Sequence, residues 1–180
     1  NVPTPRMFLA FLAPVFGSDA YYAASVCGAV LGLKKGSRLY RSLVRDSRIA
    51  AEAKAFTFDL SKGSDLLVVD ATAHPGISAQ QLETAVLAEV DALRTKPVSA
   101  AEVQRAVNLI RSDLVTAMQS AGDRADKLSM FATYFGDPAL VNAQAEKYAA
   151  VTADAVNRFI AERLGQDNRA TLMYVPGAKS

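Results

Sequence analysis

The segment GSRLYRSLVRDSRIAAE, residues Gly36–Glu52, decides how the rest of the chain is arranged. It opens with a Gly-Ser helix start signal, and Leu39, Leu43 and Val44 follow as an apolar stripe at helical spacing. Arginines lie on or beside the opposite face of this expected helix, at Arg38, Arg41, Arg45 and Arg48. The segment therefore predicts a basic amphipathic helix near the middle of the fold.

Directly after this helix the spacing of apolar residues becomes strand-like. The run AEAKAFTFDL, the turn segment SKGSD and the run DLLVVDATA together predict a β-hairpin over Ala50–Ala73. We place its turn at Lys62-Gly63-Ser64. Both faces of the second strand are largely apolar, so we expect this strand to lie in the centre of a sheet.

The flanking segments continue a mixed pattern of helices and strands. Apolar runs predict an opening strand over Pro5–Phe16 and a closing strand over Arg169–Val175. Capping boxes at Ser78/Gln81 and Ser99/Glu102 begin two helices. The helices are expected over Ala20–Leu33, Ala79–Lys96, from Ser99 to a break at Gly122-Asp123, and over Arg124–Phe135, Ala139–Ala149 and Ala153–Leu164. This order predicts an α+β fold, with a mostly antiparallel sheet and helices layered on one face.

Length and composition predict one domain over residues 1–180, because 51% of the residues are hydrophobic and no Pro/Gly/Ser-rich linker divides the chain. The net charge is +2, from 20 basic and 18 acidic residues, which is too balanced to favour nucleic-acid binding. We expect no membrane span, because no apolar run approaches 18 residues. The chain begins Asn-Val-Pro without Met, and we interpret it as a piece of a longer protein.

Catalytic and metal-binding residue types are scarce. His74 is the only histidine and Cys27 the only cysteine, so the chain lacks the usual donor set of a zinc site. We expect His74 to occupy a surface turn and Cys27 to lie in the core. No GxSxG nucleophile elbow or glycine-rich phosphate loop is present. Other candidates have structural interpretations: Asp65, Asp70, Asp123 and Asp126 as caps or solvated side chains, and Phe56, Phe58, Tyr134 and Phe135 as core.

The basic cluster around the predicted helix is the main concentration of charge. It comprises Lys34, Lys35, Arg38, Arg41, Arg45 and Arg48. One interpretation is a solvated helix face. The other is that one or two arginines reach a cleft and hold a peptide carbonyl or a carboxylate through the planar guanidinium.

Several segments, in this order, resemble the second half-domain of bacterial insulinase/pitrilysin-type (inverzincin) metallopeptidases. They are VPTPRMFLAFLAP at the start, SRLYRSLVR after Gly36, ATAHPG at 71–76, Ser-x-x-Glu at 99–102 and RATLMYVP at the end. The resemblance covers essentially the whole chain. It implies α+β half-domains that enclose a chamber for unfolded peptides, with zinc held in the other half by an HxxEH motif and a distal glutamate. The half that resembles this chain is usually inactive and helps to shape the chamber.

The resemblance also implies one substrate contact, at Arg45. In some members an arginine and a tyrosine seven residues apart complete the active site from across the chamber. Arg45 matches that arginine, but Glu52 stands where the tyrosine would be. We therefore expect Arg45 to contact substrate, assign no catalytic or metal-binding residue, and expect Glu52 to form a salt bridge with a neighbouring arginine. The mismatch suggests that the Arg/Tyr pair belongs to a partner subunit.

The expected function is that of a non-catalytic half of a zinc peptidase, inactive alone and without a cofactor of its own. The implied partners are a zinc-bearing half-domain or subunit, which supplies the zinc, and an unfolded peptide. An exposed apolar interface would favour self-association or a dimer, and the resemblance implies a periplasmic location. The alternative is a structural subunit similar to the core proteins of respiratory complexes. An unrelated small-molecule enzyme would need a pocket with convergent polar groups.

Overall fold

The computed structural model describes residues 2–59 and 63–177, which form a four-stranded antiparallel sheet with the strand order β2-β3-β1-β4. The strands are β1 Arg6–Ala13, β2 Ala50–Thr57, β3 Asp65–Ala73 and β4 Arg169–Tyr174. The hairpin and the central position of β3 are confirmed. Lys62 of the predicted turn lies outside the described residues, and Gly63 has a φ of 95°, a conformation that glycine adopts without strain.

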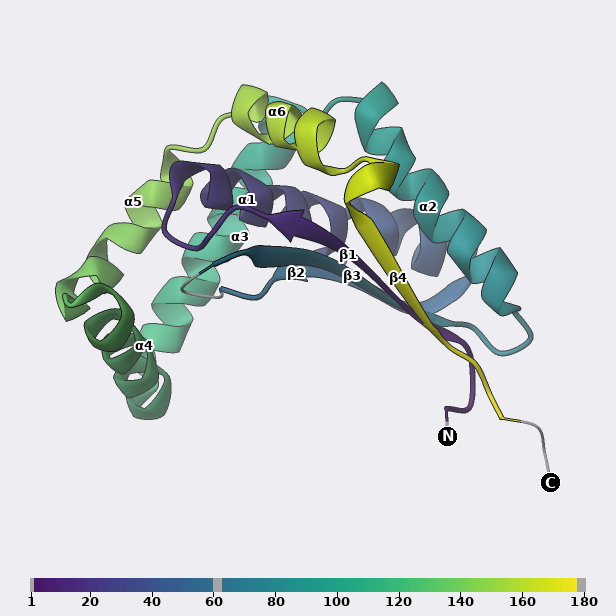
Figure 1. Ribbon diagram of the computed structural model, residues 1–180, viewed down its shortest axis with the longest axis horizontal. Helices are drawn as coiled ribbons and strands as arrows, with labels where there is room; N and C mark the ends of the chain where they lie inside the picture. The colour runs from purple at the N-terminus through teal and green to yellow at the C-terminus, as the bar shows by residue number, and fades with distance from the viewer. Residues whose placement is uncertain (1, 60–62, 178–180) are drawn as a thin grey trace.

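Helices cover one face of this sheet, as Figure 1 shows, which confirms the predicted α+β arrangement. Their bounds are α1 Asp19–Gly32, η1 Tyr40–Asp46, α2 Ala79–Thr95, α3 Ala100–Gln119, α4 Ala121–Phe135, η2 Pro138–Ala143, α5 Gln144–Ala149, α6 Ala153–Arg163 and η3 Gln166–Asn168. Helices α1, α2 and α6 contact the sheet, whereas α3 and α5 pack against α1. The result is one sheet layer beneath two tiers of helices.

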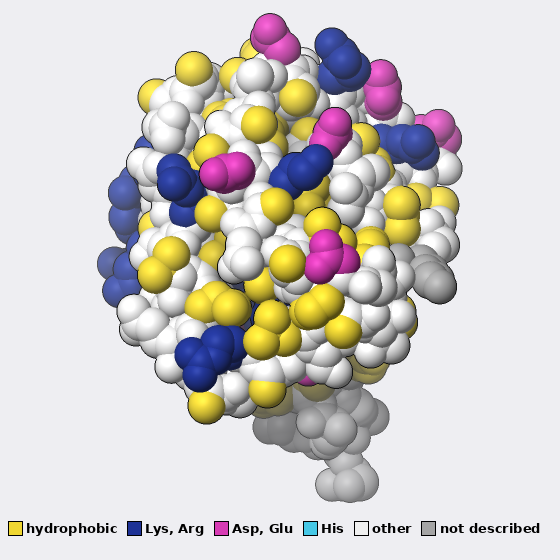
Figure 2. Space-filling view, turned by 90° about the vertical axis from the view of Figure 1, so that its left-hand side faces the viewer, with side chains coloured by type: hydrophobic (Ala, Val, Ile, Leu, Met, Phe, Trp, Pro, Cys, Tyr) yellow, Lys and Arg dark blue, Asp and Glu magenta, His cyan; other side chains and the backbone are white. Residues whose placement is uncertain are grey.

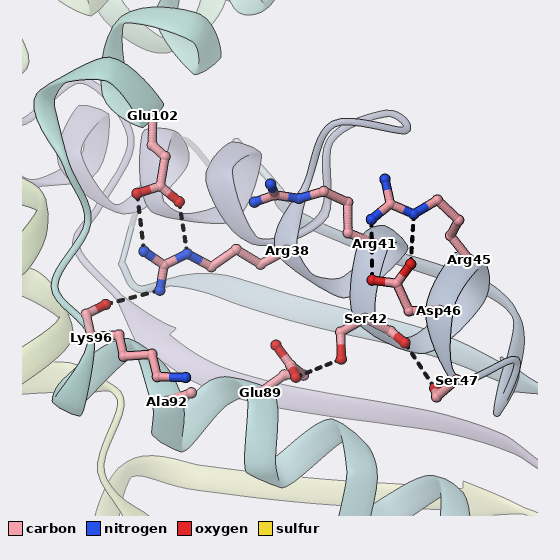
Figure 3. A pocket seen from close by; sticks show the side chains of 10 residues that line it. All are labelled: Arg38, Arg41, Ser42, Arg45, Asp46, Ser47, Glu89, Ala92, Lys96 and Glu102. Carbon is pink, nitrogen blue, oxygen red and sulfur yellow. Dashed lines mark hydrogen bonds and ion pairs between the residues drawn. The ribbon is translucent and has the colours of Figure 1, made fainter.

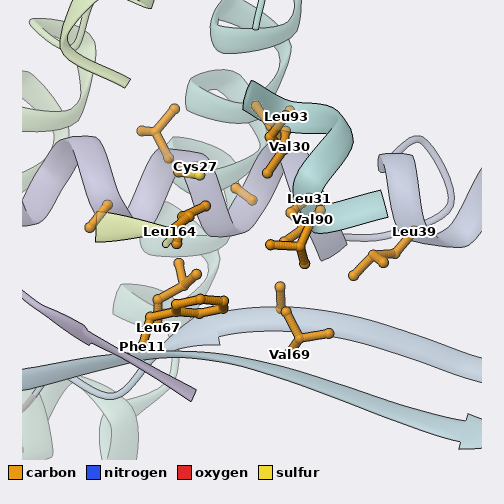
Figure 4. Close-up of a cluster of buried hydrophobic side chains, with 14 of the residues drawn as sticks. Phe11, Cys27, Val30, Leu31, Leu39, Leu67, Val69, Val90, Leu93 and Leu164 are labelled. Carbon is orange, nitrogen blue, oxygen red and sulfur yellow. The ribbon is translucent and has the colours of Figure 1, made fainter. Parts of the chain in front are cut away.

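Helix α1 is the centre of the hydrophobic core, between the sheet below and the other helices above (Figure 4). Eleven of its residues are buried, so it is apolar on all sides rather than along one stripe. Its last residue, Gly32, lies directly on β2, and a Cβ atom there would come within 1.9 Å of the Ala55 backbone nitrogen. The small residues of α1 therefore allow the helix to approach the sheet closely.

The two predicted capping boxes are confirmed, whereas the hydroxyl of Ser37, in the predicted Gly-Ser start signal, donates to the Lys34 carbonyl at 2.8 Å instead of capping a helix. Ser78 with Gln81 and Ser99 with Glu102 form reciprocal capping boxes, and Thr152 caps α6. The break between α3 and α4 is at Ser120, which accepts a hydrogen bond from the Asp123 backbone, so the predicted break at Gly122 was two residues late.

Two helix predictions were wrong in type. The basic segment forms a π-helix, η1, in which the Ser47 N–H donates to the Ser42 carbonyl five residues earlier at 2.9 Å. The Ser47 hydroxyl donates to the same carbonyl at 2.8 Å, so a second donor supports the wider turn. The helix expected over 139–149 begins with a 3-10 segment, η2, because Pro138 and the Asp137 cap produce a tighter first turn before α5.

The face of the sheet opposite the helices is open and rich in apolar side chains. Phe8 of β1 lies beside Leu172 of β4, and Leu12 and Leu172 are about half exposed. Phe58 is also half exposed, so its predicted place in the core was wrong. Tyr134 was likewise predicted to be buried but is exposed on α4, at the end of the molecule where Figure 2 shows hydrophobic side chains among charged ones.

An ion cluster with a buried carboxylate at its centre lies on the open face. Asp70 of β3 is 4% exposed and accepts two hydrogen bonds from the Arg6 guanidinium, at 2.9 and 2.7 Å. The Lys54 ammonium lies 3.2 Å from the same carboxylate. Asp65 is fully buried and accepts hydrogen bonds from the Phe58 and Leu66 backbone. The prediction that Asp65 and Asp70 are caps or solvated side chains was therefore wrong for Asp70. Asp65 does accept backbone hydrogen bonds, but it is buried and not solvated.

Candidate functional site

A groove of about 710 Å³ runs between η1 and α2. Figure 3 shows η1 along one rim and α2 along the other. The lining residues are Arg38, Arg41, Ser42, Arg45, Asp46, Ser47, Glu89, Ala92, Lys96 and Glu102. The groove thus contains three of the four arginines of the Gly36–Glu52 segment.

Arg38 serves the structure at one end of the groove. Its guanidinium donates to both oxygens of Glu102, at 2.8 and 3.0 Å, and to the Lys96 carbonyl at 2.9 Å. The side chains of Arg38 and Glu102 are only 15% and 16% exposed. Arg38 therefore ties the start of the basic segment to the junction of α2 and α3.

The same contacts explain the acidity of Glu102. The hydrogen bonds from Arg38 lower its pKa most, burial opposes them, and hydrogen bonds from Ser99 lower it further, so the pKa falls to about 2. A carboxyl group whose pKa is lower in the folded than in the unfolded state contributes stability above its unfolded pKa. That contribution is lost as the pH falls through the folded value.

We expect an NMR titration of the Glu102 carboxyl to show a midpoint near pH 2. In the Arg38→Gln variant the midpoint should rise toward the ordinary value of 4.5, because the largest cause of the shift is gone. Arg111→Gln, which removes an exposed arginine from the helix that carries Glu102, is the control and should leave the midpoint in place. An unchanged midpoint in Arg38→Gln would contradict the assigned cause.

Arg45 lies at the other end of the groove, near the C-terminal end of η1. Its guanidinium donates to both oxygens of the neighbouring Asp46, at 2.7 and 3.1 Å. These hydrogen bonds lower the pKa of Asp46, to which the charge of Arg41 adds. The Arg45 side chain is 60% exposed. A ligand can therefore reach Arg45. To bind it, the guanidinium would have to donate to the ligand and to Asp46 together, or break its hydrogen bonds to Asp46.

The predicted partner of Glu52 was wrong. The Glu52 carboxylate lies 3.6 Å from the Lys54 ammonium on the same strand rather than beside an arginine. No hydrogen bond or ion pair joins Arg45 to Glu52 within the described ranges. The two positions that the resemblance relates, seven residues apart, therefore do not act as a pair here.

Sequence reasoning did not single out Ser42, Glu89 and Lys96 as residues of a site, nor Asp46 and Ser47. Ser42 donates a hydrogen bond to Glu89 at 2.6 Å, and Lys96 faces them from the end of α2 (Figure 3). Glu89 and Lys96 lie seven residues apart, which places them on one side of a helix. That periodicity was available from the sequence, but it did not show that this side of α2 faces η1.

The residues present do not fit a zinc ion. Cys27 is fully buried among apolar side chains, and burial raises the pKa of its thiol to about 12. His74 is exposed in a turn after β3. Both placements agree with the sequence analysis. No cluster of three or more His, Cys, Asp or Glu side chains suited to a metal occurs within residues 2–59 and 63–177.

None of the helices in the described part of the chain combines the length and the apolar character needed to cross a bilayer.

The fold and the groove define an α+β domain with one helix-covered and one open sheet face. A family model described as the Peptidase M16 inactive domain matches residues 1–110. This match covers more than half of the 180 residues, so the chain belongs to the Peptidase M16 inactive-domain family. The resemblance noted in the sequence is thereby confirmed.

The relatives agree with this assignment. The zinc protease PqqE of Helicobacter pylori is 25% identical over 126 residues, which are 70% of this chain and 28% of that protein. An inactive peptidase domain from Bordetella parapertussis shares the fold with a TM-score of 0.87 and 24% identity, over 100% of this chain and 95% of that one. A chain of complex III2 from Candida albicans has a TM-score of 0.81 and 16% identity, over 96% and 43%. The chain thus spans little more than a quarter of the curated relative, and the structural likenesses show the fold alone.

Proposed function

We propose that this chain is the non-catalytic half of a zinc-dependent peptidase, which packs against a zinc-bearing half and forms one wall of the chamber where peptides are cut. Membership of the Peptidase M16 inactive-domain family is the observation that carries this proposal. The H. pylori protease of known structure supports it, because this fold accounts for 42% of that chain and leaves room for another half.

The open sheet face suits the role of a chamber wall. Its exposed leucine and phenylalanine side chains offer non-directional contacts to an extended peptide of any sequence. Within this surface the buried Asp70 carboxylate is paired with the cations of Arg6 and Lys54, so its charge is not left without a partner. An unfolded substrate could therefore contact the wall without a requirement for particular residues.

We propose that Arg45 contacts the substrate. Its guanidinium is the most exposed of the ion-paired arginines of the groove, and it can donate to a peptide carbonyl or carboxylate while Asp46 shares the remaining donors. Glu52 stands where the family pattern has a tyrosine, so we propose no second hydrogen-bond donor at that position.

The test is reconstitution. The chain is mixed in equal amounts with the zinc-bearing half and any Arg/Tyr-type partner subunit encoded beside it, and cleavage of an unstructured peptide is followed with and without a chelator. We expect cleavage that requires this chain and stops on chelation. Arg45→Gln should lower kcat/KM about tenfold, the cost of one charge-assisted hydrogen bond. Arg48→Gln removes an exposed arginine outside the groove lining and should change kcat/KM less than twofold.

The alternative is a structural subunit without proteolysis, which the similarity to a chain of complex III2 favours. The same experiment separates the two functions. A stable complex of the halves that cuts no peptide, with a zinc-bearing half that lacks an intact HxxEH motif, would support the structural role and overturn the peptidase proposal.

A further inference from the structure

The cationic side chains of the groove between η1 and α2 fall into two groups. Arg38 is held by Glu102 and Arg45 by Asp46, each through two hydrogen bonds. The guanidinium of Arg41 and the ammonium of Lys96 have no hydrogen bond or ion pair to any other part of the chain that the structure describes. Two of the four positive charges are thus without a direct partner.

The acidic side chains of the groove are already engaged. Glu102 and Asp46 belong to the two arginine pairs, and Glu89 accepts the Ser42 hydroxyl hydrogen bond. Glu89 is the carboxylate of the lining that no cation contacts directly. The lining therefore carries four positive and three negative side chains, which leaves one net positive charge for a ligand.

The two unpaired cations come from opposite rims. Arg41 extends from η1 between Arg38 and Arg45, and Lys96 reaches in from the end of α2 (Figure 3). A carboxylate suits these two cations. It accepts two parallel hydrogen bonds from the planar guanidinium of an arginine, and it is attracted by the compact positive charge of a lysine ammonium.

We infer that the groove between η1 and α2 is a binding site for a single carboxylate, which Arg41 binds through its guanidinium and Lys96 attracts from the opposite rim. One net positive charge on the lining is balanced by a monoanion, whereas a dianionic phosphate would leave the occupied groove with a net negative charge. At about 710 Å³ the groove is larger than a carboxylate alone and has the size of sites for drug-sized ligands or short peptide segments. The expectation that a peptide carries the carboxylate rests on the proposed function. The carboxylate is then either the free C-terminus of the peptide or one of its acidic side chains.

The test uses the whole 180-residue chain and four N-acetylated seven-residue peptides of otherwise neutral sequence. One has a free C-terminus, one is amidated, one is amidated with a central Glu, and one is amidated with a central Gln. Binding is read from the Nε–Hε signal of Arg41 in 15N–1H NMR spectra. We expect at least one carboxylate-bearing peptide to shift this signal, with a Kd at least tenfold lower than that of its uncharged counterpart. Which of the two binds identifies the source.

The Arg41→Gln/Lys96→Gln variant should weaken this binding at least tenfold when it is followed by 15N-labelled backbone signals of η1. The matched control, Lys35→Gln/Arg111→Gln, removes one lysine and one arginine that are exposed outside the groove and should change the Kd less than twofold. Thermal unfolding of both variants verifies that each is folded. Binding should also weaken with added salt, because the cations are partly exposed.

Three results would overturn the inference: equal binding of the Gln and Glu peptides with no preference for a free C-terminus, equal losses in both double variants, or tighter binding of inorganic phosphate than of acetate. Peptide cleavage by the reconstituted enzyme without carboxylate binding would remove this inference and leave the proposed function standing. Carboxylate binding by a chain that never supports cleavage would support this inference and overturn the proposed function.

Discussion

Gly32→Ala is expected to lower the free energy of unfolding by about 3 kcal/mol, at the upper end of what overpacking costs. The new Cβ would lie 1.9 Å from the Ala55 nitrogen and 2.5 Å from the Lys54 carbonyl carbon. Both are backbone atoms of β2, so no side chain can rotate away, and α1 must separate from the sheet on which the core depends. Urea denaturation followed by circular dichroism measures the loss.

Gly122→Ala is the matched control, because it adds the same methyl group to a helix with open space around it. The nearest atom of Ser120 is 3.9 Å from the added Cβ. We expect this variant to be at least as stable as the wild type, since alanine favours a helix over glycine, although the gain is small because Gly122 lies in the first turn of α4. If Gly32→Ala matched the wild type in stability, the close contact between α1 and β2 would be disproved.

Asp70→Asn is expected to cost about 2–3 kcal/mol at pH 7, somewhat less than the loss of a fully buried pair because Arg6 is 40% exposed. The substitution leaves the charges of Arg6 and Lys54 on the sheet without their shared acid. Burial by itself raises the pKa of Asp70, but the hydrogen bonds and charges of Arg6 and Lys54 outweigh it, and the net shift is downward.

This shift gives the prediction a pH dependence. In the wild type the contribution of Asp70 is complete above its unfolded pKa of about 3.9 and disappears as the pH falls through the lower folded value. Stability curves of wild type and Asp70→Asn should therefore begin to approach each other below about pH 4 and meet only below the folded pKa of Asp70. Asp91→Asn, an exposed acid on α2, is the control and should change stability by less than about 0.5 kcal/mol. A constant difference at every pH would refute the ion-cluster explanation.

The elements that the sequence predicted correctly have local signals. The β2–β3 hairpin follows from strand-like apolar runs, and the capping boxes are defined by side chains three residues apart. The type of η1 was missed because side-chain spacing does not reveal whether backbone N–H groups bond four or five residues back, as the Ser47 N–H does to the Ser42 carbonyl. An apolar stripe is compatible with either turn.

The non-local features could not be read from spacing. Asp70 is buried because strand register brings Arg6, which is 64 residues away in the sequence, onto it. The groove likewise depends on how η1 and α2 pack, so the sequence indicated its arginines but not Lys96 or Glu89. Local chemistry therefore predicted which elements form, and packing decided which charges meet.

The strand order also determines when the protein is most at risk during its synthesis. Of the four strands that the structure describes, β1 is made first, and it lies between β3 and β4, which is made last, so that Phe8 pairs opposite Leu172. Until β4 has left the ribosome, one side of β1 keeps its backbone donors and acceptors open to any other nascent chain. Chaperones that shield extended apolar segments would therefore matter most for this domain after β1, β2 and β3 have emerged from the ribosome and before β4 has emerged.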